Sequence, residues 1–352
     1  MGKPQVETGK NRNQERLVGR AARVSLVASI LILVVKFWAF HLTHSEAILS
    51  DALESIANVV AAALALLVLA IADKPADRDH PYGHGKVEFF SAAFEGGLIF
   101  FAAIMIIVAA IQTFGRSDPI QDLGWGLALI IASGLINALL GYYLLRSGKR
   151  HHSEALKASG QHVLSDFWTT FGVVVGLALV HATGYVWLDS ATALIVGLSL
   201  AWTGVKLVRR SAGGLLDEED LETLKVLSEI VSQQRPSGFI QVHHVRIMRS
   251  GSFHHIDAHV VVPEFWTVTE AHDRTDAYEN WVMKEYPQHA ELRLHVDPCR
   301  QKYCRACDVS PCPVRRAPFE KRIDISLEDL TSPEEPPQYR DRVVDRDRLT
   351  SS

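Results

Sequence analysis

The stretch QHVLSD, residues 161–166, places a histidine and an aspartate inside an apolar run that extends to about residue 180. His162 and Asp166 are four positions apart, so in a helix their side chains lie on one face, one above the other. An ionisable pair at membrane depth is costly, and it is retained where it faces a cavity, a partner or an ion path. The stretch therefore predicts half of a metal site inside a membrane helix.

A second stretch, DALESIAN (residues 51–58), repeats this spacing with Glu54 and Asn58. Together the two helices would offer an imidazole, two carboxylates and an amide oxygen. Such a set suits Zn²⁺, Co²⁺, Ni²⁺, Fe²⁺ or Cd²⁺ better than Mg²⁺ or Ca²⁺, which prefer all-oxygen shells. Because the same groups take up protons when a metal leaves, metal binding and protonation compete at one place. The alternative is an interhelical polar contact without an ion, worth about 1 kcal/mol.

The composition divides the chain into an apolar part and a charged part. Of the 352 residues, 48% are hydrophobic, and the mean hydropathy is +0.08. Six apolar segments are long enough to cross a bilayer, which takes about 20 residues each. They lie near residues 22–43, 46–72, 89–114, 122–146, 157–181 and 187–208. The net charge of −4 argues against nucleic-acid binding.

Basic residues are concentrated on one side of these segments. They precede the first segment and follow the second and the fourth: Lys3, Lys10, Arg12, Arg16, Arg20, Arg23, Lys74, Arg78, Lys86, Arg146, Lys149 and Arg150. The loops on the opposite side hold one arginine and no lysine. The positive-inside rule therefore predicts that both termini are cytoplasmic.

Beyond the apolar segments the pattern becomes that of a small soluble α/β domain in the order αββαβ. Its predicted helices are Asp217–Gln233 and Thr269–Glu285, and its strands are Phe239–Arg249, Phe253–Pro263 and Ala290–Val296. This order fits a sheet covered on one face by helices. The predicted organisation is an N-terminal cytoplasmic segment (1–21), a six-helix transmembrane domain (22–210), the α/β domain (211–298), a cysteine-rich segment (299–325) and a disordered tail (326–352).

Three motifs together resemble the cation diffusion facilitator family over about residues 15–298: HVLSD (162–166), SDALESIAN (50–58) and PADRDHPYGHGKVE (75–88). The resemblance implies an all-α six-helix transmembrane domain followed by a cytoplasmic ferredoxin-like domain. It also implies a homodimer in the lipid bilayer of a bacterial inner membrane that exports a divalent metal ion, such as zinc, in exchange for protons by alternating access.

The resemblance also assigns site residues. It implies a transport site made of Glu54, Asn58, His162 and Asp166. The family commonly has Asp or His followed by Asp on the second helix, whereas this chain has Glu, which reaches further, and Asn, a neutral and weaker ligand. Asp51 is interpreted as a helix-packing group or a group on the ion's path into the site, and Lys36 and Glu95 as helix-to-helix or proton-path groups.

Two further clusters follow from the resemblance. Asp77, His80 and His84 correspond to a second, cytoplasmic metal site, for which a solvated polar loop is the alternative. A regulatory metal cluster at the domain and dimer interface would use His243, His259 and His272, with His295 and Asp297, which share a strand face. The other histidines of the domain, His244, His254 and His255, are expected to be ordinary surface residues.

Two other classes of protein are alternatives to a transporter. An intramembrane metalloenzyme would need a pattern such as HExxH, which the sequence lacks, so no enzyme is predicted. A membrane-anchored metal sensor would bind metal without moving it. Charged residues midway along several membrane helices argue against a passive anchor.

All four cysteines of the chain lie in one short segment with the spacing C-x4-C-x2-C-x4-C: Cys299, Cys304, Cys307 and Cys312. In a reducing cytoplasm, clustered thiols are metal ligands more often than disulfides. Tetrahedral zinc held by four thiolates is the expected occupant. An iron–sulfur cluster fits the ligand type, although none of its usual spacings is reproduced. Thiols that bind loosely, sense redox state or have no role are the third alternative.

Overall fold

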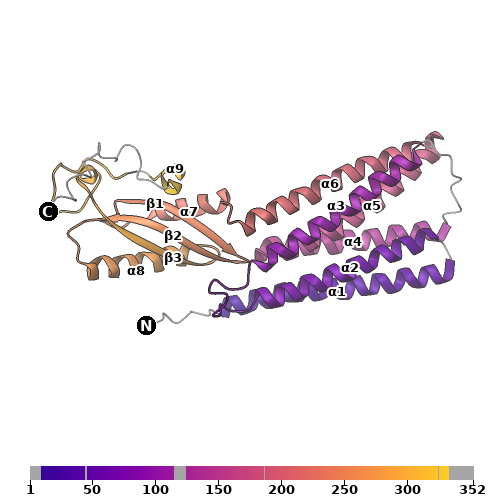
Figure 1. The fold of residues 1–352 in the computed structure, drawn as a ribbon, viewed down its shortest axis with the longest axis horizontal. Helices are drawn as coiled ribbons and strands as arrows, with labels where there is room; N and C mark the ends of the chain where they lie inside the picture. Colours follow the sequence, from indigo (N-terminus) through magenta and orange to yellow (C-terminus); the bar gives the residue numbers. More distant parts are fainter. Residues whose placement is uncertain (1–8, 44–45, 115–123, 186, 324, 333–352) are drawn as a thin grey trace. The chain divides into compact units, whose positions relative to one another are not determined.

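The computed structural model describes residues 9–43, 46–114, 124–185, 187–323 and 325–332, and it divides the chain into two compact units, Met1–Leu216 and Asp217–Ser352. The first unit consists of long helices (Figure 1). They are α1 (Gly9–Thr43), α2 (Glu46–Ala72), α3 (Val87–Thr113), α4 (Gly124–His151), α5 (Glu154–Thr183) and α6 (Trp187–Leu215).

Within the described residues, four of these helices hold an apolar stretch long enough to cross a membrane: Leu17–Trp38, Val87–Gln112, Glu154–Val180 and Ser190–Leu215. A shorter apolar stretch, Asn58–Ala72, lies in α2. Several helices are longer than the apolar segments that predicted them, and α1 begins at Gly9. Hydropathy marks only the part at membrane depth, whereas backbone hydrogen bonding continues the helix into its charged flank.

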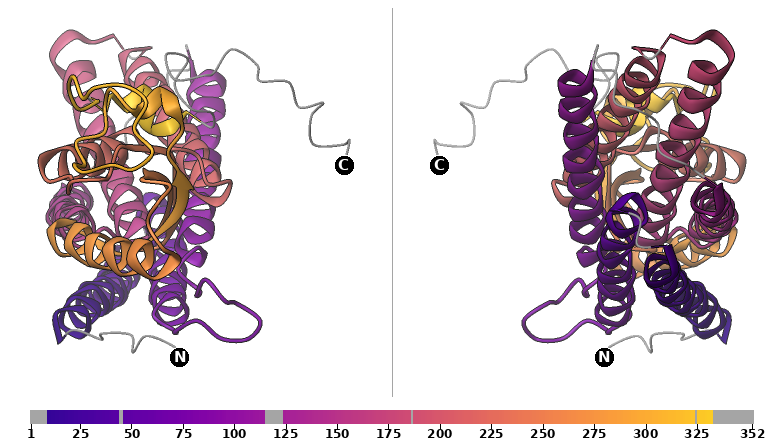
Figure 2. Two further views of the ribbon diagram at one scale, coloured as in Figure 1. Left: turned by 90° about the vertical axis from the view of Figure 1, so that its left-hand side faces the viewer. Right: turned by 90° about the vertical axis from the view of Figure 1, so that its right-hand side faces the viewer.

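The helix α5 is central in this unit, since it contacts each of α1, α2, α3, α4 and α6. Figure 2 views the helices from both ends. Glycine brings neighbouring backbones close: a Cβ atom on Gly160 would lie 2.7 Å from the backbone nitrogen of Leu145 in α4. Small residues commonly allow such approach between membrane helices. The helix that carries His162 and Asp166 is thus enclosed by the others.

The start of α5 is fixed by a capping contact. Ser153 is the N-cap residue, and its hydroxyl accepts a hydrogen bond from the Leu156 N–H at 3.3 Å. The same hydroxyl donates to Glu88 Oε2 of α3 at 2.6 Å, and that oxygen also accepts the Ala155 N–H at 3.2 Å. These bonds satisfy donors at the helix start and fix α5 against α3.

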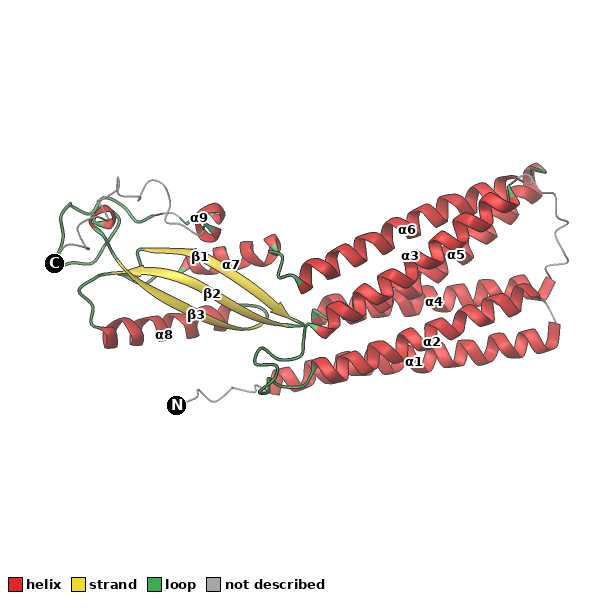
Figure 3. Cartoon of the chain, in the orientation of Figure 1, coloured by secondary structure: helices red, strands yellow, loops and turns green. Residues whose placement is uncertain are grey.

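The second unit has the element order αββαβ that the sequence predicts (Figure 3). Its elements are α7 (Leu221–Gln233), β1 (Gln241–Ser250), β2 (Phe253–Val262), α8 (Val268–Glu285) and β3 (His289–Pro298). The strands form one sheet in the order β1-β2-β3, in which β1 pairs antiparallel and β3 parallel with β2. A tight turn with Gly251 at φ 63° joins β1 to β2.

One face of the sheet carries the core of this unit. The buried residues Leu227 of α7, Ile256 of β2 and Val282 of α8 belong to one hydrophobic cluster, so both helices cover the same face. Side chains alternate between faces along a strand. His259, next to the buried Val260, therefore belongs to the opposite face, and it pairs with His243 of β1 and His295 of β3 in the register of the sheet.

The predicted disordered tail begins too early. Residues Leu327–Thr331 form a short helix, α9, capped by Ser326, whose hydroxyl accepts the Asp329 N–H at 3.1 Å. Leu330 is fully buried in the core of the sheet domain. The polar composition of the segment hides this contact, because three apolar residues, Ile325, Leu327 and Leu330, are enough to dock one helical turn on an existing core. Residues 333–352 of the predicted tail lie outside the described residues.

Candidate metal-binding sites

The predicted intramembrane site joins α2 and α5. The Asn58 amide donates from Nδ2 to Asp166 Oδ2 at 2.5 Å, and its Oδ1 lies 3.0 Å from His162 Nε2. One asparagine thus bridges an imidazole and a carboxylate one helical turn apart, and His162 is only 7% exposed. Glu54 and Asp51 lie on α2, but their side chains are outside the described residues. The structure brings together three of the four predicted ligands.

The atoms that meet here are ligand types of divalent transition metals: an imidazole nitrogen, an amide oxygen and a carboxylate oxygen. Nearby hydroxyl groups are engaged elsewhere. Thr169 and Thr170 donate to the Asp166 carbonyl oxygen at 2.8 and 2.9 Å, and Ser165 donates to the His162 carbonyl oxygen at 2.5 Å. These hydroxyls bond the backbone of α5 and leave the ligand-type side chains facing α2.

Of the other two predicted intramembrane charges, Glu95 of α3 is fully buried, and the Ser159 hydroxyl of α5 donates to its Oε1 at 3.0 Å. Glu95 therefore makes the helix-to-helix contact that was one of its two predicted roles. Lys36 is buried on α1. The spacing argument missed Ser159 because it lies three residues before His162, off the i, i+4 pattern.

The loop group Asp77, His80 and His84 is one of two groups, among the described residues, whose ligand atoms all lie within 4.8 Å of one another. Asp77 Oδ1 is 3.2 Å from His80 Nδ1, and Asp77 Oδ2 is 3.4 Å from His84 Nε2. The backbone N–H of His80 lowers the pKa of Asp77, which keeps this carboxylate ionised. Gly83, at φ 80°, makes the tight turn that brings the two imidazoles together.

The second such group is His243, His259 and Asp297, one residue from each strand of the sheet. Asp297 Oδ2 lies 3.0 Å from His259 Nδ1 and 3.7 Å from His243 Nε2. His243 is 4% exposed, and burial lowers its pKa to about 4. The imidazole is therefore neutral at physiological pH, which is the form that binds metal.

The other histidines of the sheet domain are placed differently. His295 adjoins the group, with its Nε2 3.6 Å from Asp297 Oδ1. His272 is exposed on α8, which covers the other face, so the structure of one chain does not bring it to the group. His244 contacts His259 with ring centroids 4.8 Å apart, because a register shift in β1 after His243 turns it. The expectation that His254 lies on the surface is wrong, since it is buried against Tyr286.

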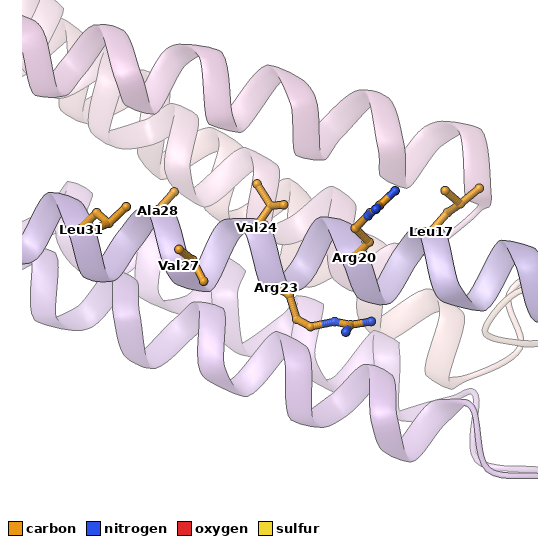
Figure 4. A pocket seen from close by; sticks show the side chains of 7 residues that line it. All are labelled: Leu17, Arg20, Arg23, Val24, Val27, Ala28 and Leu31. Atoms are coloured by element: carbon orange, nitrogen blue, oxygen red, sulfur yellow. The ribbon is translucent and has the colours of Figure 1, made fainter.

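A cavity of about 990 Å³ lies away from these sites. It runs along α1 (Figure 4), lined by Leu17, Arg20, Arg23, Val24, Val27, Ala28 and Leu31. Its lining is apolar apart from two arginines. Apolar side chains with a few cations beside them suit a lipid better than a metal ion. A second cavity, of about 470 Å³, is lined by all four cysteines.

Residues 22–216 match the family described as cation efflux transmembrane domain, and residues 219–299 match the cytoplasmic domain of cation efflux proteins. The chain belongs to the cation efflux, or cation diffusion facilitator, family. Members of this family are membrane transporters of divalent metal cations. The motifs of α2, α5 and the loop between α2 and α3 had predicted this family.

Relatives cover most of the chain. It is 36% identical to an uncharacterized transporter of Synechocystis sp. over 284 residues, which span 80% of this chain and 91% of the relative. It is 27% identical to the cation-efflux pump FieF of Escherichia fergusonii over 293 residues, 82% of this chain and 95% of the pump. The FieF pump of Salmonella arizonae is 25% identical over the same shares.

Proposed function

We propose that this cation efflux protein exports a zinc-like divalent transition metal ion from the cytoplasm in exchange for protons. The transport site consists of Glu54, Asn58, His162 and Asp166. The observation that carries the proposal is the Asn58 amide, which joins the imidazole and the carboxylate of α5 to α2 at 3.0 and 2.5 Å. Because the polar side chains come from two membrane helices, an ion bound between them is released when the helices separate.

The ligand set explains both selectivity and coupling. An imidazole with carboxylates favours Zn²⁺, Fe²⁺, Co²⁺, Ni²⁺ or Cd²⁺ over Mg²⁺ and Ca²⁺. The metal binds the deprotonated forms of His162, Asp166 and Glu54, so protons and metal compete for one set of groups. Alternating access of this site to the two sides of the membrane then exchanges metal for protons.

The proposal places six helices across a bacterial inner membrane with both termini in the cytoplasm. The C-terminal unit is a ferredoxin-like domain that joins two protomers in a homodimer. Its group of His243, His259 and Asp297, with His295 beside it, holds a regulatory metal ion. The loop group of Asp77, His80 and His84 lies between α2 and α3 in the sequence, and it collects metal at the cytoplasmic ends of these helices. The assignment of His272 to the regulatory site stays a prediction.

Flux into proteoliposomes with an imposed pH gradient tests the proposal. The panel is Zn²⁺, Fe²⁺, Co²⁺, Ni²⁺, Cd²⁺ and Mn²⁺, and a pH-sensitive dye inside the liposomes reports proton movement. We expect zinc-like ions to move with opposing proton flux, and Asp166→Ala to reduce flux to that of empty liposomes. The control is Thr169→Val, which removes a hydroxyl bonded to the Asp166 carbonyl but no ligand atom.

Three outcomes would contradict the proposal or a part of it. Near-native flux in Asp166→Ala would remove the transport-site assignment. Metal binding in detergent without flux in liposomes would favour a membrane-anchored metal sensor instead. Transport of metal without any proton movement would leave the site in place and remove the exchange mechanism.

A further inference from the structure

All four cysteines of the chain line one cavity in the second unit, with a volume of about 470 Å³. Cys299 directly follows β3, and Cys304, Cys307 and Cys312 lie in the segment after it. The first three are buried, the last is partly buried, and all four are free thiols. The family match of the cytoplasmic domain ends at residue 299, so the cluster lies at its end and beyond. Neither the proposed transport site nor the histidine group of the sheet uses these thiols.

The cysteine segment is packed on the sheet domain. Tyr303 is fully buried, in one hydrophobic cluster with Val261 of β2. Cys299 and Cys307 belong to the same cluster. The Cys299 N–H also donates to the Val262 carbonyl oxygen of β2 at 2.7 Å. Two of the thiols are thus fixed against the sheet, and the other two lie in the same loop.

One cation holds the backbone of this loop. The Arg315 guanidinium donates to the carbonyl oxygens of Cys304 and Cys307 at 2.9 Å each, of Val309 at 2.7 Å and of Ala317 at 3.3 Å. These bonds close the loop that carries three of the thiols. Arg315 also lines the cavity, where its positive charge favours thiolates over thiols.

Three of the four sulfurs lie beside backbone N–H donors. The Arg316 N–H donates to Cys304 Sγ at 3.3 Å. Burial raises the pKa of the Cys299 and Cys307 thiols, and a hydrogen bond from the backbone opposes that rise at each of them. A buried thiol without a role behaves as a small apolar side chain and needs no such donor. Hydrogen bonds to sulfur are typical of metal-bound thiolates, whose negative charge they help to offset.

The thiols also influence one another's ionisation. After burial and the contact with Glu264, the neighbouring Cys307 and Cys304 raise the pKa of Cys299, and Cys312 raises that of Cys307. Thiolates that share one cavity therefore repel one another, and a metal cation among them removes this repulsion and deprotonates the thiols that it binds.

The sulfurs need to approach one another to share an ion. The four sulfurs, all of described residues, do not form a group as tight as the two described above, in which all ligand atoms lie within 4.8 Å of one another. A cysteine sulfur moves by about 3 Å between staggered positions of its side chain. Rotation into the cavity that the four side chains line therefore brings the sulfurs together, while the backbone stays as Arg315 holds it.

We propose that Cys299, Cys304, Cys307 and Cys312 form one binding site for a resident thiophilic metal, held by thiolates and separate from the transported ion. Soft sulfur ligands in this number are the ligands of Zn²⁺ and of iron–sulfur centres. Each thiol loses its proton to solvent when it binds. The metal then ties the loop closed by Arg315 to the end of β3, at the edge of the sheet domain.

The test uses the fact that the chain has no cysteine outside this cluster, so a thiol reagent reports on this site alone. Full-length protein is purified in detergent without oxygen, freed of reductant and passed over a chelating resin. It is then titrated with p-mercuribenzoate, and the metal and acid-labile sulfide that the reagent releases are measured. We expect metal to leave in step with the reaction of the four thiols. Imidazole and carboxylate ligands do not react with the mercurial, so cargo metal is not released.

The composition of what is released identifies the metal, and either result supports a thiolate site. About one zinc per chain without sulfide means a single ion, and iron with sulfide means a cluster. Cys304→Ser/Cys307→Ser should release no metal. The matched control is Gln301→Ala, which changes a cavity-lining side chain that is no thiol and should release as much metal as the native protein.

The single variant Cys312→Ser guards against loss of folding, because it changes the least buried of the four thiols. We expect it to elute as the native protein does and to release less metal. Reaction of all four native thiols without release of metal would overturn the proposal. Equal release from the native protein and from Cys304→Ser/Cys307→Ser would overturn it too, as would fewer than four reactive thiols in the unfolded native chain, which would indicate disulfides. None of these results depends on whether the flux assay succeeds.

Discussion

The intramembrane site and the group on the sheet use the same kinds of ligand atoms on very different supports. In the membrane, Asn58, His162 and Asp166 come from two helices joined by 2.5 and 3.0 Å contacts between side chains. In the sheet, His243, His259 and Asp297 come from three adjacent strands, and backbone ladders fix their register. The first set can separate without breaking a backbone hydrogen bond, whereas the second cannot.

This difference favours the proposed roles, in which the helix pair moves an ion and the sheet keeps one. A helix satisfies its backbone hydrogen bonds internally, so α2 and α5 can shift past each other at the cost of side-chain contacts. Separating two strands breaks the ladder that forms the domain. A cargo ion must be released, and a regulatory ion must stay. The helix pair suits transport, and the sheet suits a resident ion.

The largest effect is expected when one imidazole is removed from each site. His162→Ala deletes a ligand of the proposed cargo site, and we expect zinc flux in proteoliposomes to fall to the level of empty liposomes. His259→Ala deletes a ligand of the proposed resident ion, and we expect flux to remain measurable, lowered by about tenfold at most. Equal loss of flux in the two variants, both eluting as folded protein, would show that the sites do not differ in this way.

Helical spacing is a local property, so the sequence could place His162 and Asp166 on one face of α5 without knowledge of how the helices pack. Their grouping with Asn58 of α2 was a prediction from the matching spacing and the family resemblance, and the Asn58 side chain does contact both residues. The contact between Glu95 and Ser159 could not be derived in this way, because it depends on which faces of α3 and α5 meet.

The sheet group depended on register, which one residue of slippage reverses. His243 and His259 are paired only in the register that β1 and β2 adopt. The register shift after His243, which brings His244 to His259, has no recognisable signal in the sequence. The sequence did not predict the burial of Leu330 either, because the few apolar residues that dock the segment hardly change its polar composition.

The next largest effect is a loss of stability of the sheet domain at low pH. Burial lowers the pKa of His243 from its ordinary value of 6.5 to about 4, and its titratable and charged neighbours are Asp297, His259, His244 and Lys302. The unfolded chain then binds more protons than the folded one between these values, so stability is full above about pH 6.5 and falls as pH drops towards 4. The loss is about 3 kcal/mol at most.

Urea unfolding of residues 217–332 with a chelator, at pH 7 and at pH 4.5, measures this loss. The matched variant is His243→Gln, which cannot titrate in this range, so its stability should depend less on pH. Other carboxylates contribute to both proteins alike, and only the difference between them is assigned to His243. The same pH dependence in both would mean that the fold tolerates a charged imidazole there.

A smaller effect is expected at Asn58, which contributes a neutral amide to the proposed transport site. Asn58→Ala removes the bridge between His162 and Asp166 but no charge, and we expect flux to fall several-fold, in line with about 1 kcal/mol for a lost hydrogen bond. Asn58→Asp adds a hard, charged oxygen ligand and should broaden selectivity towards Mn²⁺. Proteoliposome flux with both ions measures this, and an unchanged Zn²⁺ to Mn²⁺ ratio in Asn58→Asp would show that residue 58 is not a ligand.

The smallest effect should come from His272, which is exposed on the helix that covers the opposite face of the sheet. A metal ion that binds only the folded state at one hundred times its dissociation constant stabilises that state by about 2.7 kcal/mol. We expect Zn²⁺ to raise the melting temperature of residues 217–332 almost as much in His272→Ala as in the native sequence, and His259→Ala to abolish the rise. If His272→Ala abolished it too, the resident ion would require a ligand from beyond the sheet face of one chain. The sheet site would then, like the intramembrane site, be assembled from separate elements, in this case from the two chains of the dimer.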